Sequence, residues 1–310
     1  MKNNRVTISQ YWLGMIVCSF YAVIFTDNTA SFLTLLLCAA AVAFNLFVER
    51  YYSGEMSSMT RVVLIFYFIF VSVLSVVRFN EYMFKSLGYG PYLLITPIML
   101  VFAFFCAVKG LEPVARAGGI VLFFLIAALV YIFVCCFNYT SFTVTAEFSD
   151  NFFTLVVLLF PSASYVWFYN NIIPDKNYTK WFYTGLTLGV ELWFMCVSAG
   201  ERGEFPFQRV PEVAKIGVFR GADCMLLELL TVGGLFIFAA VQTALFGNST
   251  RKYSSRIVYL LFVGFISLLC LCFEPLRATL YNNIFAVFVI LVFVLTVSFE
   301  MLQKSMNKNS

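Results

Sequence analysis

Glu191 is the side chain best suited to chemistry, because it places a carboxyl group in the middle of an otherwise apolar segment, residues 181–199. Thr184, Thr187 and Ser198 recur with it at helical spacing, so a helix would gather them into one polar stripe. A charge at membrane depth is costly, and it usually has a partner or a purpose. Two interpretations stay open: a carboxyl that exchanges protons along a water-filled path, or a neutral Glu hydrogen-bonded to a neighbouring helix.

A weaker form of the same pattern occurs in the apolar segment 222–246, where Thr231 follows Glu228 by one helical turn. A carboxyl there would face the same cost of burial. The candidate residues for proton coupling or a polar path are therefore Glu191, Thr187 and Glu228.

The second candidate site is a predicted helix break within residues 152–169, where Pro161 is followed by Ser162, Ala163 and Ser164. Proline removes a backbone donor and clashes with the preceding turn. The first apolar segment, residues 10–25, is also weak, because a membrane-crossing helix needs roughly 20 residues. Two interrupted helices that meet at mid-membrane expose backbone groups that can hold a small ligand. The alternative is a proline that only kinks a helix, with a first segment that is short by chance.

These two segments supply the predicted ligand-binding residues. Backbone groups freed at the breaks would hold the carboxylate or the amine of a small ligand, and two phenylalanines would line its side chain. The set is Cys18, Ser19, Phe20, Phe160, Pro161, Ser162, Ala163 and Ser164.

Several classes of site are missing from the sequence. Histidine is absent, which removes the commonest general base and metal ligand. The nine cysteines lie in or beside apolar segments and form no CxxC pair, so we interpret them as small hydrophobic residues. No nucleophile–base pair, metal cluster or phosphate loop is visible, and no basic patch suggests nucleic acid. We therefore expect neither an enzyme nor a cofactor.

Composition indicates that the elements carrying these residues lie in a lipid bilayer. Of the 310 residues, 62% are hydrophobic and only 12% are charged. A soluble domain carries roughly a quarter charged residues, so this chain has too little polar surface to cover a globule. Because lipid offers the backbone no hydrogen-bond partner, the membrane-crossing segments must be helices.

Apolar runs predict about ten transmembrane helices in a single all-α domain. They lie near 10–25, 30–48, 61–77, 91–108, 117–137, 152–169, 181–199, 222–246, 257–273 and 284–301. Thirteen Lys and Arg residues fall at the N-terminus, the even-numbered loops and the C-terminus, against seven in the odd-numbered loops. Positive charge accumulates on the cytoplasmic side, so both termini are expected to be cytoplasmic. The weak first and sixth helices are five apart, which is typical of a five-plus-five inverted repeat covering about 8–137 and 149–303.

Other residues have positional roles. Aromatic residues lie at predicted span ends, where amphipathic rings favour the membrane interface, so we expect them to anchor the helices there. They are Trp12, Tyr51, Tyr52, Tyr92, Trp181 and Tyr183. The loop 200–221 mixes charged and apolar residues, which suits either a short amphipathic helix over the outer face or a solvated loop.

Several motifs, taken in order, resemble one family. They are Ile8-Ser9-Gln10, Arg78-Phe79-Asn80-Glu81, Leu94-Ile95-Thr96-Pro97, Lys109-Gly110-Leu111-Glu112 with Arg116, Phe160-Pro161-Ser162, Ile173-Pro174 and Asp223. Together the chain resembles the spore-germination permeases, the transporter-like membrane subunits of nutrient germinant receptors, in the amino acid–polyamine–organocation superfamily.

The resemblance implies a LeuT-like fold with discontinuous helices 1 and 6, and a pocket between helices 1, 3, 6 and 8. It also implies an amino-acid-like germinant, a large membrane subunit and a lipoprotein as partners, and a place in the spore inner membrane or cell membrane. The leading hypothesis is a receptor subunit whose ligand shifts a conformational equilibrium. A proton-coupled amino acid transporter and a scaffolding subunit with a vestigial pocket are the alternatives.

Overall fold

The computed structural model describes residues 5–24, 32–54, 56–87, 92–109, 152–175, 179–198 and 253–309, with scattered positions between 112 and 130. Almost all of these residues are helical, which confirms the all-α class. The elements are β1 (Val6–Thr7), α1 (Ile8–Ile24), α2 (Phe32–Tyr51), α3 (Ser58–Leu87), α4 (Tyr92–Lys109), α6 (Phe152–Leu158), α7 (Phe160–Phe168), the 3-10 turn η2 (Tyr169–Asn171), β2 (Ile172–Ile173), α8 (Thr179–Ser198), α11 (Tyr253–Cys272), α12 (Glu274–Leu280) and α13 (Asn283–Asn309).

The apolar runs predicted the helices well. Predicted spans 1–4, 7, 9 and 10 each correspond to one helix, and span 6 corresponds to the pair α6–α7. Predicted span 8 and most of span 5 lie outside the described residues, as do the loop 200–221, Glu228 and Asp223. The ten-helix count and the repeat boundaries therefore stay predictions.

Within the described residues, two helical segments are long and apolar enough to cross a membrane, Ser58–Glu81 and Asn283–Met306. A third is counted if Ile257–Cys272 and Glu274–Leu280, which meet at a bend of 112°, form one broken span. The bend follows from sequence, because Pro275 favours the first turn of a new helix and Glu274 interacts well with its positive end. The fold thus contains at least two segments suited to a bilayer.

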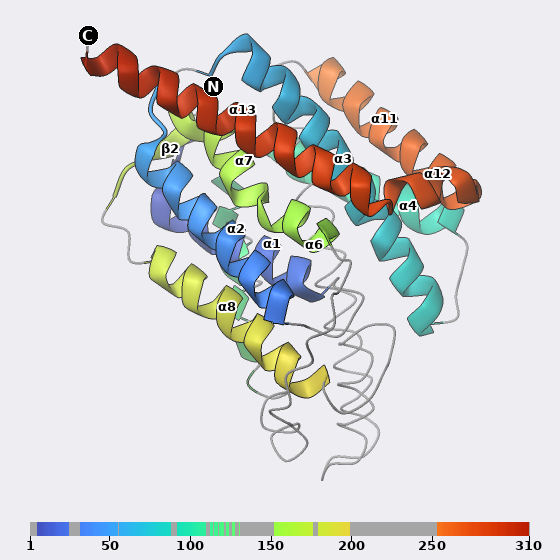
Figure 1. Cartoon of the computed structure of the whole chain (residues 1–310). Helices are drawn as coiled ribbons and strands as arrows, with labels where there is room; N and C mark the ends of the chain where they lie inside the picture. The colour runs from blue at the N-terminus through green and yellow to red at the C-terminus, as the bar shows by residue number, and fades with distance from the viewer. Residues whose placement is uncertain are drawn as a thin grey trace.

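The helices form two groups that share one core (Figure 1). In the first, α1 packs on α8, α6 and α7, while α2 packs on α8, α7 and α6. In the second, α11 packs on α4 and α3, and α13 packs on α3. Contacts of α13 with α6 and of α3 with α7 join the groups. The candidate break between α6 and α7 therefore lies where both groups meet.

A short parallel sheet connects the start of α1 to the end of α7. Val6 is paired with Ile172 and Thr7 with Ile173. Val6 is fully buried. Strand β1 runs directly into α1, and β2 follows α7 through η2. The pairing of the two strands therefore fixes the start of α1 relative to the end of α7.

A polar cluster joins the α2–α3 connection to the C-terminal end of α13. Glu300 accepts hydrogen bonds from the Tyr52 hydroxyl at 3.2 Å and from the Ser57 N–H at 3.2 Å, and its carboxylate lies 2.9 Å from Lys304 Nζ. The Lys304 ammonium also lies 4.3 Å from the centre of the Tyr52 ring. Gly54 lies in the same connection with φ of 100°, a conformation that favours glycine. The cluster brings the α2–α3 connection and the C-terminal end to one side of the fold.

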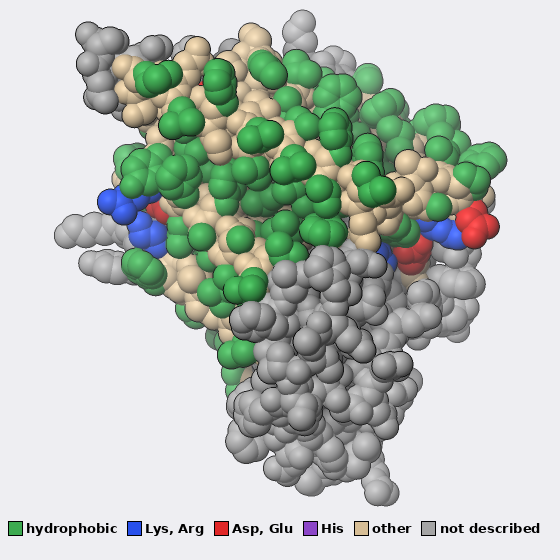
Figure 2. Space-filling view, viewed as in Figure 1, with side chains coloured by type: hydrophobic (Ala, Val, Ile, Leu, Met, Phe, Trp, Pro, Cys, Tyr) green, Lys and Arg blue, Asp and Glu red, His purple; other side chains and the backbone are tan. Residues whose placement is uncertain are grey.

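The surface is apolar over much of the face shown in Figure 2. Along α13 the side chains of Ile284, Phe288, Leu295 and Phe299 are each more than 60% exposed. The charged side chains visible on this face lie towards its edges (Figure 2). Continuous exposed apolar surface is rare on soluble monomers, so this face is compatible with a membrane environment.

Candidate functional site

The predicted break in the sixth span is present, and it is narrow. Helix α6 ends at Leu158 and α7 begins at Phe160, with Leu159 between them. Helical hydrogen bonds continue on either side, from the Leu159 N–H to Leu155 and from the Ala163 N–H to Leu159. Pro161 has no N–H to donate, so the regular ladder fails at this turn.

The side chain of Asn45, from α2, fills the break. Its Nδ2 donates to the carbonyl of Leu158 at 2.8 Å, and its Oδ1 accepts from the N–H of Ser162 at 3.1 Å. In a regular helix those two backbone groups would bond to each other. Asn45 is only 1% exposed, so no water competes for them. One side-chain amide therefore replaces one missing helical hydrogen bond.

Two tyrosines pair with further carbonyls around the break. The hydroxyl of Tyr11, on α1, donates to the carbonyl of Pro161 at 2.5 Å and lies 2.7 Å from the hydroxyl of Ser164. The hydroxyl of Tyr67, on α3, donates to the carbonyl of Val156 at 2.5 Å. Since a buried carbonyl without a donor costs free energy, these hydroxyls stabilise the irregular segment.

Tyr183, on α8, completes the network. Its hydroxyl lies 2.8 Å from Asn45 Nδ2 and 3.5 Å from Ser19 Oγ on α1. Its ring packs on Trp12, with the ring centres 4.7 Å apart. Both rings are almost completely buried, and Tyr52 is only 3% exposed, so the prediction that Trp12, Tyr52 and Tyr183 anchor the helices at the interface is wrong. Trp181, which is 66% exposed, remains compatible with that role.

The predicted ligand-binding residues do converge. Ser19 reaches the break through Tyr183 and Asn45, while Ser164 contacts α1 directly through Tyr11. Cys18, Ser19 and the run Phe160–Ser164 are all buried, and the Phe20 side chain lies outside the described part. The structure therefore shows a closed site whose freed backbone groups are occupied by the protein's own side chains.

The prediction of a discontinuous first helix is wrong for the described residues. Helix α1 is continuous from Ile8 to Ile24. After Gly14 it contains neither glycine nor proline, so each added residue propagates the helix. Gly14 serves packing instead, because a Cβ on Gly118 would lie only 2.8 Å from the Gly14 Cα. A side chain at Gly118 would push the two segments apart, whereas a Cβ on Gly14 would make only an ordinary contact, 3.8 Å from the Ala115 Cα.

The predicted polar stripe on α8 is seen in part. Thr187 is 1% exposed, and its hydroxyl has no hydrogen-bond partner among the residues that the structure describes. The Thr184 hydroxyl donates to the carbonyl of Lys180, one turn earlier. The Glu191 backbone lies in α8 one turn after Thr187, but its side chain falls outside the described set. Its role in proton coupling stays a prediction.

Sequence reasoning missed Asn45, Tyr11 and Tyr67. A signal existed for Asn45, because it is the one amide side chain in the apolar run 30–48. A polar side chain in such a segment usually has a partner. The partner itself is 117 positions away in sequence, so only the fold reveals it.

Comparison with known proteins identifies no family for this chain. No model of a protein family matches the chain. No curated protein matches it significantly.

Proposed function

We propose that this chain is a multi-pass membrane protein that binds a small amino-acid-like nutrient at the break between α6 and α7. It would act as the transporter-like subunit of a spore nutrient germinant receptor, in the spore inner membrane or cell membrane. The observation that carries the proposal is the position of Asn45 in the break. The ordered set of motifs, from Ile8-Ser9-Gln10 to Asp223, supports the family.

The Asn45 amide shows what kind of ligand fits. It offers one acceptor to the Ser162 N–H and one donor to the Leu158 carbonyl. A zwitterionic amino acid offers the same pair, with its carboxylate for the N–H and its ammonium for the carbonyl. Charged groups make stronger hydrogen bonds than a neutral amide. The ligand would therefore displace Asn45 and take over both contacts.

Displacement gives binding a conformational consequence. Asn45 lies on α2 and contacts Tyr183 on α8, and Tyr183 reaches Ser19 on α1. Releasing Asn45 from the break would loosen α2 and α8 from α7 together. A ligand shifts such an equilibrium only by its difference in affinity for the two states. Here that difference arises because the closed state has Asn45 where the ligand binds.

A bulky substitution at the break tests this function. Ser162→Trp should abolish the nutrient response of spores while the protein still accumulates in the membrane, because the ring would occupy the space at the Ser162 N–H. Leu261→Trp, at an exposed position of α11, a helix that packs on α4 and α3, is the control. An unchanged response in Ser162→Trp would remove this site, and an absent response in the wild-type protein would favour the scaffolding alternative.

The second candidate is a proton-coupled amino acid transporter. It is favoured by the buried Thr187 hydroxyl, unpaired among the described side chains and one turn before Glu191. Uptake of radiolabelled amino acids into proteoliposomes under a pH gradient separates the two functions. An amino acid flux that is lost in Glu191→Gln would favour transport, whereas binding without any flux would favour sensing.

The orientation belongs to the same proposal. The N-terminal strand pairs with β2, and the α2–α3 connection contacts the C-terminal end of α13. Both termini lie at one end of the fold, while α12 lies at the other end of α13 (Figure 1). The distribution of Lys and Arg supports a cytoplasmic position for the end that holds the termini.

A further inference from the structure

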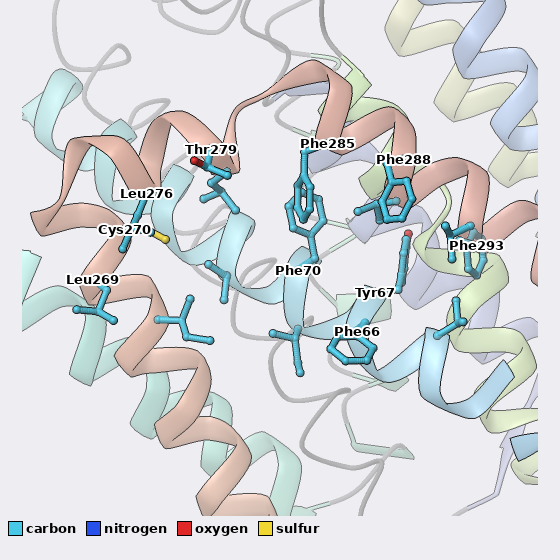
Figure 3. Close-up of a pocket in the computed structure, with 17 residues that line it drawn as sticks. Phe66, Tyr67, Phe70, Leu269, Cys270, Leu276, Thr279, Phe285, Phe288 and Phe293 are labelled. Carbon is cyan, nitrogen blue, oxygen red and sulfur yellow. The ribbon is translucent and has the colours of Figure 1, made fainter. Parts of the chain in front are cut away.

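A deep apolar groove lies between α3, α11, α12 and α13 (Figure 3). Its volume is about 670 Å³, within the range of about 300–1,000 Å³ that is usual for small-molecule sites. Tyr67, Phe70 and Phe293 form its buried floor, each at most 9% exposed. Phe66 and Phe288, each more than 60% exposed, form its rim.

The groove is long and narrow. On α3 it extends from Val63 to Val73, which is about 15 Å at 1.5 Å per residue. Apart from Tyr67, Thr279 is the only described lining residue with a hydroxyl group. That hydroxyl donates to the Pro275 carbonyl. The wall therefore offers dispersion contacts and almost no hydrogen bonds, which suits a hydrocarbon chain.

A cluster of charged residues lies near the α12 end of the groove. Leu276, Thr279 and Leu280 of α12 line the groove, and Arg277 belongs to the same short helix. The Arg277 side chain is 34% exposed, and its Nε lies 3.8 Å from Glu81. Arg78 lies 4.0 Å from the same carboxylate, which also accepts a hydrogen bond from the Tyr281 hydroxyl at 2.6 Å.

In this cluster the guanidinium groups of Arg78 and Arg277 share the carboxylate of Glu81. Arg78, on α3, also stacks over the Tyr281 ring, at 4.1 Å from its centre. A guanidinium has five N–H donors, so one distant carboxylate oxygen leaves Arg277 with capacity for a phosphate. The planar guanidinium matches the geometry of a phosphate group, which it can bind through two N–H donors.

We propose that the groove binds one acyl chain of an anionic phospholipid, whose phosphate is held by Arg277. The nearby guanidinium favours a phospholipid over an apolar helix of a partner, because only the phospholipid brings a phosphate to Arg277. The inference rests on the membrane placement proposed above. The groove and the break share Tyr67, but the inference requires no ligand at Asn45.

The test uses the full-length protein, first shown to resist carbonate extraction from membranes, so that a failure of membrane placement is recognised separately. Native mass spectrometry then measures retention of dioleoyl phosphatidylglycerol against dioleoyl phosphatidylcholine. Arg277→Gln should lower the preference for phosphatidylglycerol at least fivefold. Arg116→Gln is the matched control, because Arg116 also pairs with a carboxylate, that of Glu112, but lies outside the groove. Glu274→Gln, which removes a negative charge from the first turn of α12, should raise the preference.

The acyl chain is tested by filling the groove. Val289→Trp, on the α13 wall, should reduce retention of both lipids, whereas Leu261→Trp, at an exposed position outside the groove, should leave it unchanged. Retention of both lipids at the wild-type level in Val289→Trp would overturn the proposal. So would an effect of that variant on self-association alone, because the groove would then be a protein interface.

A measurement on the wild-type protein covers the case in which Val289→Trp does not fold. Phosphatidylglycerol with a diazirine at mid-chain should label residues 63–73 of α3 and 285–293 of α13. Labelling spread evenly over exposed positions such as Leu295 and Phe105 would contradict a specific site.

Discussion

Asn45 and Ser162 are joined by a hydrogen bond of 3.1 Å from the Ser162 N–H to Asn45 Oδ1, between helices separated by 117 positions in sequence. The same amide donates to Leu158 on the other side of the break. A single side chain thus closes the gap that Pro161 opens. This relationship explains how an irregular helix stays stable without a ligand, and it also defines what a ligand must replace.

Asn45→Ala should destabilise the closed protein. It leaves a buried N–H and a buried carbonyl without partners, at a cost of about 1–3 kcal/mol for each group. Thermal unfolding in detergent should show a clear fall of the midpoint. Asn282→Ala is the control, because the Asn282 side chain is exposed and accepts one hydrogen bond, from the Ile284 N–H; it should cost about 1 kcal/mol or less. Equal losses in the two variants would contradict the bridging role of Asn45.

Tyr67→Phe removes the hydroxyl that donates to Val156, and Tyr11→Phe removes the one that donates to Pro161. Tyr67→Phe should cost about 1–2 kcal/mol, because it removes the donor to the buried Val156 carbonyl while the ring still fills its space. Tyr11→Phe should cost less, about 1 kcal/mol, because the Ser164 hydroxyl also lies 3.1 Å from the Pro161 carbonyl. Tyr51→Phe, at a ring that is 53% exposed, should have almost no effect. The midpoints of thermal unfolding of the three variants decide between a specific hydrogen bond and a general loss of polarity.

These contacts show where the sequence was informative and where it was not. Pro161 acts on its own turn, so the break could be predicted from the residue alone. The short apolar run at residues 10–25 was interpreted as a second break, but length does not interrupt a helix that lacks glycine and proline after Gly14. Asn45 and Tyr183 form hydrogen bonds with residues far away in sequence, and the residues around them in the chain do not indicate which partners these are. Position at a span end was likewise a poor guide, because Trp12 and Tyr183 turn inward and pack on each other.

Glu300→Gln should loosen the α2–α3 connection from α13. The carboxylate is buried and has an ammonium and three hydrogen-bond donors around it, so losing its charge should cost about 1–3 kcal/mol. Glu112→Gln, in a more exposed pair with Arg116, should cost less than about 0.5 kcal/mol. Limited proteolysis within residues 52–57 should increase in Glu300→Gln and not in the control.

The same cluster predicts a response to alkaline pH. Burial raises the pKa of the Tyr52 hydroxyl above its ordinary value, and the nearby Glu300 carboxylate raises it further. A group with a higher pKa in the folded state contributes its full stability below the unfolded pKa, about 10 for tyrosine, and loses it as the pH rises towards the folded pKa. Tyr52→Phe should therefore lose less stability than the wild-type protein above about pH 10.

Tyr51→Phe is the control for that experiment, since its exposed ring has no such contact with Glu300. A stability profile of Tyr52→Phe that runs parallel to the wild-type profile above about pH 10 would refute the role given to this hydroxyl.

The placement of the termini predicts a labelling pattern. With Cys272 replaced by serine, cysteines introduced at Asp175 and Ser305 should react with a membrane-impermeant maleimide from one side of the membrane, and a cysteine at Ala278 of α12 from the other. Asp175 follows β2, and Ser305 lies near the end of α13, so the fold puts both with the termini. Reaction of Asp175→Cys and Ser305→Cys from opposite sides would contradict this arrangement.

The affinity of Asn45→Ala for amino acids tests the central claim most directly. If a nutrient binds by displacing the Asn45 side chain, removing that competitor should tighten binding about tenfold, or about 1.4 kcal/mol, even though the unliganded protein becomes less stable. Calorimetric titration of the purified protein with the standard amino acids would first identify a ligand for the wild type, and then compare its affinity for Asn45→Ala. Tighter binding by the variant is the predicted result, and equal or weaker binding would contradict the account.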